Sequence, residues 1–114
     1  MPLSERQRAH VTKRLTAYCE ARVPPAVRDR VRLGFRIQGN EVVLFEERPA
    51  FDAPQKWTES PVAKFRYVAS RGVWRLYCQR RDLRWHAYWL RNTAANFGTL
   101  LAEVDADPTG IFWG

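Results

Sequence analysis

Basic and aromatic side chains alternate along residues 62–90, and together they could bind a nucleic acid. Three strands are predicted in this stretch. Because alternate side chains of a strand point to opposite sides, one face collects arginines, a lysine and aromatic rings. Many single-strand binders stack bases on exposed aromatic rings and contact phosphates with arginines. The residues predicted to bind nucleic acid, two of them from a preceding hairpin, are Arg32, Arg36, Lys64, Arg66, Arg75, Tyr77, Arg84, His86 and Tyr88.

A second interpretation fits the same residues. On an ordinary solvated sheet face, long arginines cover apolar area and keep the edges of the sheet from pairing with other strands. No ribonucleoprotein-type motif is present to favour RNA binding. His86 also has two interpretations. It is either a proton carrier or base-stacking group, or a structural histidine that is hydrogen-bonded within the sheet.

Five tryptophans in 114 residues indicate another class of function, protein binding. Packing in the core accounts for Trp74 and Trp85. The remaining three, Trp57, Trp89 and Trp113, are candidate anchors of a homodimer or of an interface with a partner protein, because Trp and Arg are enriched at binding hot spots. Nucleic-acid binding predicts one contiguous positive face, whereas a protein interface predicts a contiguous apolar patch that contains Trp89 or Trp113.

The acidic residues form no recognisable catalytic motif. Glu46, Glu47, Asp52 and Glu59 surround a long predicted loop. A Mg²⁺-dependent nuclease needs two or three converging carboxylates, and this spacing matches no such site. A Gly-rich phosphate loop, a Gly-x-Ser-x-Gly elbow and a Cys–His pair are also absent. We therefore expect no catalytic residues, no metal and no cofactor; an enzyme would instead place Glu46 or His86 in a pocket.

The net charge of +7 is segregated along the chain. Residues 1–36 sum to +6 and residues 64–91 to +7, whereas residues 37–63 and 92–114 sum to −3 each. This distribution favours an electropositive surface that suits DNA or RNA.

Cysteine use and hydropathy indicate a cytoplasmic protein. Cys19 and Cys78 fall on predicted buried faces, which is typical of free thiols in a reducing compartment, and they are too few for a Cys/His metal site. We expect no membrane-spanning segment and no signal peptide, because no long apolar run occurs and the first residues are polar.

Periodicity and turn residues predict the elements that position these side chains. A capping box at Ser4 and Gln7 starts a helix near residue 5, and the Pro24-Pro25 pair ends it. Residues 30–38 and 41–47 form a hairpin around the Gly39-Asn40 turn, with an expected ion pair between Arg32 and Glu47 across the two strands. Residues 48–61, with three prolines, are expected to form a long connection.

The meander of residues 62–90 completes the predicted sheet, and a second helix, capped by Asn92 or Thr93, follows it. The fold expected is therefore α+β, as a single domain of residues 1–114. It has an antiparallel sheet of about five strands, made of a hairpin and a three-stranded meander, with an N-terminal and a C-terminal helix packed on one face.

Several segments are similar to a known family. They are the Val-Arg-Leu-Gly-Phe-Arg-Ile-Gln-Gly-Asn hairpin, residues 46–49, 57–67 and 80–86, and the closing residues 105–114 with their Phe-Trp-Gly end. Together they resemble a family of small bacterial proteins known as a domain of unknown function (number 3024). The resemblance implies a bacterial source and a single compact domain, and it brings no activity or catalytic residues.

Overall fold

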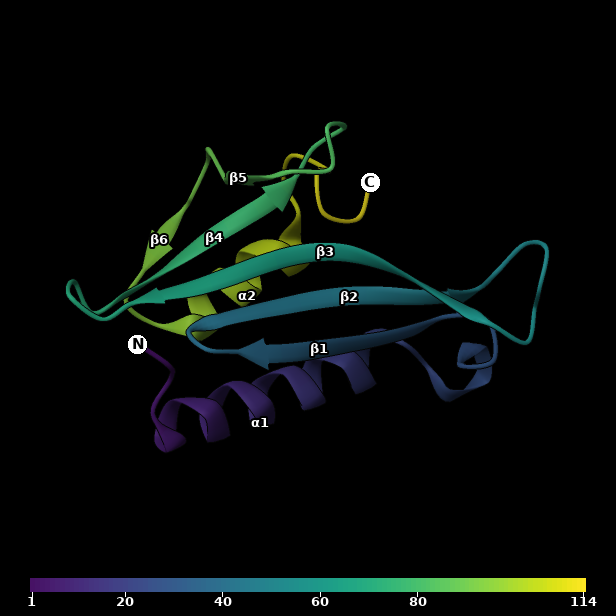
Figure 1. Ribbon diagram of the computed structural model, residues 1–114, viewed down its shortest axis with the longest axis horizontal. Helices are drawn as coiled ribbons and strands as arrows, with labels where there is room; N and C mark the ends of the chain where they lie inside the picture. Colours follow the sequence, from purple (N-terminus) through teal and green to yellow (C-terminus); the bar gives the residue numbers. More distant parts are fainter.

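An antiparallel sheet forms the centre of the protein in the computed structural model, which describes residues 1–114 (Figure 1). The strands lie in the order β1-β2-β3-β4-β5, and the short β6 also pairs with β4. The predicted α+β class is confirmed. The elements in chain order are α1 (Glu5–Arg22), a 3-10 turn (Pro25–Val27), β1 (Arg32–Gln38), β2 (Glu41–Pro49), β3 (Trp57–Val68), β4 (Val73–Gln79), β5 (Trp85–Ala87), β6 (Thr93–Ala94) and α2 (Phe97–Ala106).

Both helices cover the same face of the sheet, as predicted. Their apolar stripes and the inward side chains of β2, β3 and β4 form one core, which leaves the opposite face without a helix. In Figure 1, α2 lies behind β3 and β4, so the helix-free face is toward the reader. The fully buried core side chains with the largest volumes are Tyr88, Phe65, Phe97, Leu15, Leu44, Leu76 and Leu100.

Local signals start α1 and the hairpin where the sequence predicts them. The Gln7 N–H donates to the Ser4 hydroxyl at 3.1 Å, and the Ser4 N–H donates to the Gln7 side-chain oxygen at 3.0 Å. This reciprocal pair satisfies two N–H groups that the first turn leaves without a helical partner. At the hairpin, Gly39 has a φ of 63°, which glycine adopts without strain, and Phe35 lies opposite Leu44.

The prediction of an ion pair between Arg32 and Glu47 is wrong, although these residues do lie opposite each other. The Arg32 guanidinium lies 3.8 Å from the centre of the Trp57 ring, and its Nε donates to the Arg28 carbonyl at 3.3 Å. An aromatic ring and a carbonyl thus replace the carboxylate as its partners.

The predicted long connection is shorter than expected, because β3 begins at Trp57 rather than at residue 62. Trp57 pairs with Pro49, so only residues 50–56 join β2 to β3. A register shift beside Phe45 and Pro61 leaves one extra residue in β3. A bulge of this kind tolerates a proline that cannot donate to the ladder, which is why Pro61 does not end the strand.

The last strand is also shorter than predicted. β5 ends at Ala87, and β6 pairs Thr93 with Arg75. Thr93 therefore lies in a strand and does not cap a helix; α2 follows Asn96 instead, without a side-chain capping bond. The chain between β5 and β6 leaves the edge of the sheet at Tyr88, whose side chain turns into the core.

Candidate nucleic-acid interface

The helix-free face carries a compact group of cations and aromatic rings on β3, β4 and β5. We call Lys64, Arg66, Arg75, Tyr77 and Trp85 the basic-aromatic face. Lys64 lies directly opposite Tyr77, and Arg66 lies directly opposite Arg75. Because residues paired across two strands point to the same side, all four side chains share the face that the helices leave open.

Tyr77 is the centre of this group. The Lys64 Nζ lies 5.1 Å from the centre of the Tyr77 ring, and the Arg66 and Arg75 guanidinium carbons lie 5.4 and 6.0 Å from it. Lys64 Nζ is also 5.5 Å from the Trp85 ring. All five side chains are partly exposed. Cations therefore surround aromatic surface that remains within reach of a ligand.

The two arginines of this face stand close together without acidic partners. Glu41 lies directly opposite Arg66 on β2, but its carboxylate pairs with Lys64 at 3.4 Å, and no carboxylate is within ion-pair distance of Arg66 or Arg75. Like charges directly opposite each other destabilise a sheet. An anion bound between Arg66 and Arg75 would offset this repulsion.

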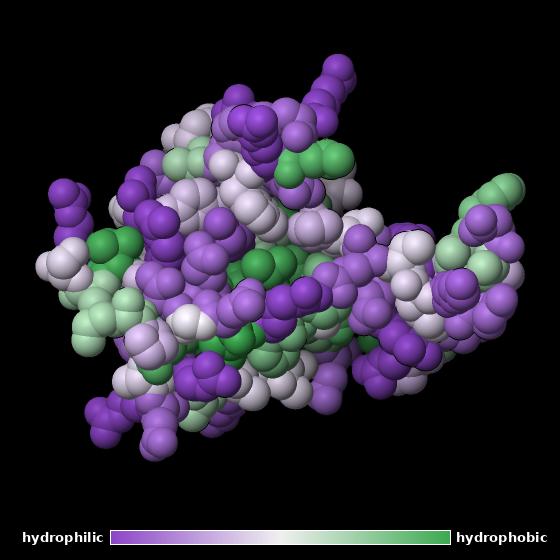
Figure 2. Space-filling view, in the orientation of Figure 1, coloured by the Kyte–Doolittle hydropathy of each residue, from purple (hydrophilic) through white to green (hydrophobic).

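The β1–β2 half of the same face is closer to neutral. Arg36 lies over the Phe45 ring at 4.8 Å and forms an ion pair with Glu59, and Arg32 is held over Trp57. Figure 2 shows the helix-free face as largely hydrophilic, with small hydrophobic areas near its middle. The predicted positive charge without an acidic partner is thus carried by Arg66 and Arg75, while the predicted Arg32, Arg36 and Lys64 have partners of their own.

Three residues predicted on the last strand do not join this face. Arg84 lies in the turn before β5 and is exposed. His86 pairs with Cys78, which faces the core, so alternation puts His86 on the helix-covered side, where its Nε2 lies 2.9 Å from Asp82. The prediction for Tyr88 is wrong, because its side chain is fully buried.

Trp85 lies on this face, although the sequence did not predict it there. It was expected in the core, but it pairs with Gln79 and therefore points to the helix-free side. Pairing β4 with β5 across the turn would have found it: if Gln79 and Tyr77 face outward, so must Trp85.

The turn between β4 and β5 is fixed by Asp82. Its carboxylate accepts a hydrogen bond from the Arg84 N–H at 2.9 Å and contacts the His86 ring at 2.9 Å. The Arg84 N–H, and after it the His86 contact, hold the pKa of Asp82 below its ordinary value. His86 therefore has a structural partner, as the second interpretation of this residue expected.

The tryptophans considered as interface anchors differ in exposure. The Trp113 indole N–H donates to the Val104 carbonyl at 3.1 Å, and the Arg22 guanidinium lies 3.9 Å from its ring centre. Trp57 is covered by Arg32. Trp89 is 52% exposed. Only Trp89 thus matches the exposed position that an interface anchor requires.

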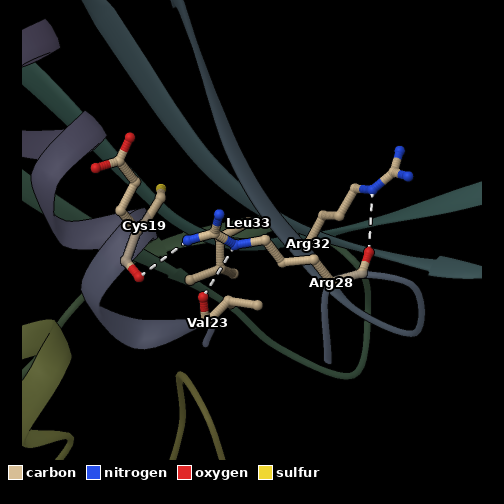
Figure 3. Close-up of a pocket in the computed structure, with 6 residues that line it drawn as sticks. Cys19, Val23, Arg28, Arg32 and Leu33 are labelled. Carbon is tan, nitrogen blue, oxygen red and sulfur yellow. Dashed lines mark hydrogen bonds between the residues drawn. The ribbon is translucent and has the colours of Figure 1, made fainter. Parts of the chain in front are cut away.

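A cavity of about 170 Å³ lies where the end of α1 meets β1 (Figure 3). The Arg28 side chain donates to the Val23 and Glu20 carbonyls at 3.2 and 3.5 Å, so its guanidinium closes the last turn of α1. Burial raises the pKa of the Cys19 thiol to about 11, which keeps it protonated at neutral pH. The cavity residues are Cys19, Glu20, Val23, Arg28, Arg32 and Leu33.

The acidic residues are distributed among arginines. Glu46 pairs with Arg48 at 2.7 Å, and Glu59 pairs with Arg36. No group of three or more His, Cys, Asp or Glu side chains is placed to hold a metal ion. Neither helix combines the length and the apolar character that crossing a membrane requires.

The chain matches a known protein family. A family model described as Domain of unknown function (DUF3024) matches residues 3–114, nearly the whole chain. No curated protein and no solved structure matches the sequence.

Proposed function

We propose that this chain, which belongs to the DUF3024 family, is a non-enzymatic module that binds single-stranded nucleic acid on the helix-free face of its sheet. One observation carries the proposal. Arg66 and Arg75 lie directly opposite each other without acidic partners, beside the partly exposed ring of Tyr77. The repulsion between the two guanidinium groups favours an anionic ligand, and the ring beside them favours one that has a flat aromatic part.

The basic-aromatic face supplies both kinds of contact that a single strand needs. Bases stack on Tyr77 and Trp85, with each stacked base contributing about 1–3 kcal/mol. Phosphates contact Arg66 and Arg75, and the release of counterions makes this part of the affinity fall with salt. A duplex offers its phosphates but keeps its bases paired and stacked, so we expect single strands to bind more tightly than duplexes.

The cysteines support a cytoplasmic location for this module. Cys19 and Cys78 are both free thiols, and proteins in reducing compartments keep their thiols in this form.

Binding of fluorescent oligonucleotides across a salt series tests the proposal. We expect micromolar or tighter binding of a single strand, with a log–log salt slope of about −0.7 for each phosphate contact. Arg66→Ala combined with Arg75→Ala should weaken binding and flatten the slope. The matched control is Arg6→Ala with Lys13→Ala, which removes the same charge from the exposed side of α1.

Two outcomes would contradict the proposal. One is the absence of binding even at low salt, which would leave the positive charge as an aid to solubility. The other is equal weakening by the sheet variant and the α1 variant, which would show that net charge, rather than this face, attracts the oligonucleotide.

A further inference from the structure

The edge of the sheet opens into an arch between β5 and β6. The Tyr88 N–H donates to the Leu76 carbonyl at 2.9 Å, and the Leu76 N–H donates to the Asn92 carbonyl at 2.8 Å. Both ends of the segment are therefore bonded to a single residue of β4, and residues 89–91 extend away from the ladder. In Figure 1 this segment forms the corner where the chain turns from β5 into β6. We call residues 88–92 the edge arch.

The base of the edge arch is firmly held. The Tyr88 side chain is fully buried, its ring centre lies 4.9 Å from that of Phe112, and its hydroxyl lies 3.3 Å from the Thr109 hydroxyl. The two residues that follow have the opposite exposure: Trp89 is 52% exposed and Leu90 is 56% exposed. The fold thus fixes the arch and presents two large apolar side chains in succession.

A hollow of about 410 Å³ adjoins the edge arch, lined by Arg80, Arg81, Trp89 and Ile111. The Arg80 guanidinium carbon lies 5.4 Å from the Trp89 ring centre. Neither Arg80 nor Arg81 has a carboxylate within ion-pair distance. The hollow therefore combines an apolar floor with two cations that lack an ionic partner.

We propose that the edge arch and this hollow form a docking site for an acidic segment of a partner protein that carries at least one large apolar side chain. The apolar side chain packs against Trp89 and Ile111, and carboxylates of the segment pair with Arg80 and Arg81. Trp and Arg together are the residue types that most often carry the binding energy of protein interfaces.

The composition of the surface favours a peptide over a second nucleic-acid site. Trp89 is the one ring of this surface on which a base could stack, whereas the neighbouring Leu90 and Ile111 are aliphatic and suit an aliphatic or aromatic side chain of a peptide. The surface is also separate from the basic-aromatic face: Ile111 packs against the core, on the side of the sheet that the helices cover. A peptide and a single strand could thus be bound at the same time.

Selection from a phage-displayed library of random dodecapeptides tests the proposal without a known partner. Peptides enriched on the wild-type protein should combine Asp or Glu with large apolar residues. Synthetic copies should bind Trp89→Ala at least about tenfold more weakly than wild type, since a buried tryptophan anchor contributes energy of this order.

Charge reversal distinguishes peptide binding at the docking site from nonspecific attraction of acidic peptides to a basic protein. Arg80→Glu with Arg81→Glu should also weaken the selected peptides at least about tenfold. Arg6→Glu with Lys13→Glu, which changes the net charge equally on α1, should bind them as wild type does. Circular dichroism spectra that match wild type show that each variant is folded.

Three results would overturn the docking site. They are a selection that enriches no acidic, apolar peptides, equal binding of the selected peptides to the two charge-reversed variants, and binding that Trp89→Ala leaves unchanged. Loss of oligonucleotide binding in Trp89→Ala would also count against it, because the hollow would then belong to the nucleic-acid site.

Discussion

Replacing Tyr77 with alanine isolates the contribution of base stacking. The Tyr77 ring is partly exposed on the helix-free face, with the cations of Lys64, Arg66 and Arg75 at 5.1, 5.4 and 6.0 Å from its centre. If one base stacks on this ring, its loss should cost about 1–3 kcal/mol of binding free energy. The dissociation constant of a single-stranded oligonucleotide should then rise between about 5-fold and about 150-fold.

The assay is fluorescence anisotropy with a labelled oligo-dT at several salt concentrations. Tyr77→Ala removes no charge, so the salt slope should stay at the wild-type value while the affinity falls. Tyr77→Phe keeps the ring and should bind nearly as tightly as wild type. Arg66→Ala, in contrast, should reduce the magnitude of the slope by about 0.7, because one phosphate contact is lost.

Two outcomes would refute base stacking on Tyr77. If Tyr77→Ala binds as tightly as wild type while Arg66→Ala weakens binding, only phosphates are contacted and stacking on the face is excluded. If Tyr77→Ala changes the slope, the ring positions the cations rather than a base.

Three further predictions concern residues outside the basic-aromatic face. Asp107 has a φ of 44° and accepts hydrogen bonds from two backbone N–H groups of the C-terminal tail. Asp107→Ala should therefore lower the free energy of unfolding, measured by urea titration, by about 1–3 kcal/mol. Asp107→Asn should lower it by less, because asparagine tolerates a positive φ. Wild-type stability in both variants would contradict this role. With its pKa raised to about 11, Cys19 should react slowly with a disulfide reagent at pH 8. The rate should rise about tenfold for each unit of pH increase up to about 11, because the thiolate is the reacting form, and should be fast near pH 8 only after unfolding. Fast reaction of the folded protein at pH 8 would contradict the burial of this thiol. Hydrogen bonds from the Arg84 N–H and the His86 ring lower the pKa of Asp82 in the folded state. Their contribution to stability is therefore complete above the pKa of the unfolded state and is lost as the pH falls through the pKa of the folded state. NMR titration of this carboxyl should give a midpoint below 3.8, and a midpoint at or above 3.8 would refute the role of these bonds.

Local patterns were sufficient to predict much of the fold. The capping box placed the start of α1, and the Gly39-Asn40 turn set the hairpin register, because both depend on residues only a few positions apart. The meander placed Lys64, Arg66 and Tyr77 on one face for the same reason: alternation within a hairpin fixes which side chains are neighbours.

The remaining features depend on contacts between distant segments. The register of β5 against β4 directs Tyr88 toward the core, but the positions of Phe112 and Thr109, which it contacts there, depend on how the C-terminal tail docks. Likewise, the Arg32 guanidinium is directed to Trp57 by the extension of β3 past its bulge, which the prolines in this stretch concealed.

Mapping a bound oligonucleotide by NMR tests the central claim most directly. In ¹H–¹⁵N spectra of the labelled protein titrated with oligo-dT, we expect the largest shifts at the amides of residues 64–66 and 75–77 and at the Trp85 indole N–H, with the exposed side of α1 unchanged. Shifts confined to α1, or spectra that do not change, would contradict binding at the helix-free face.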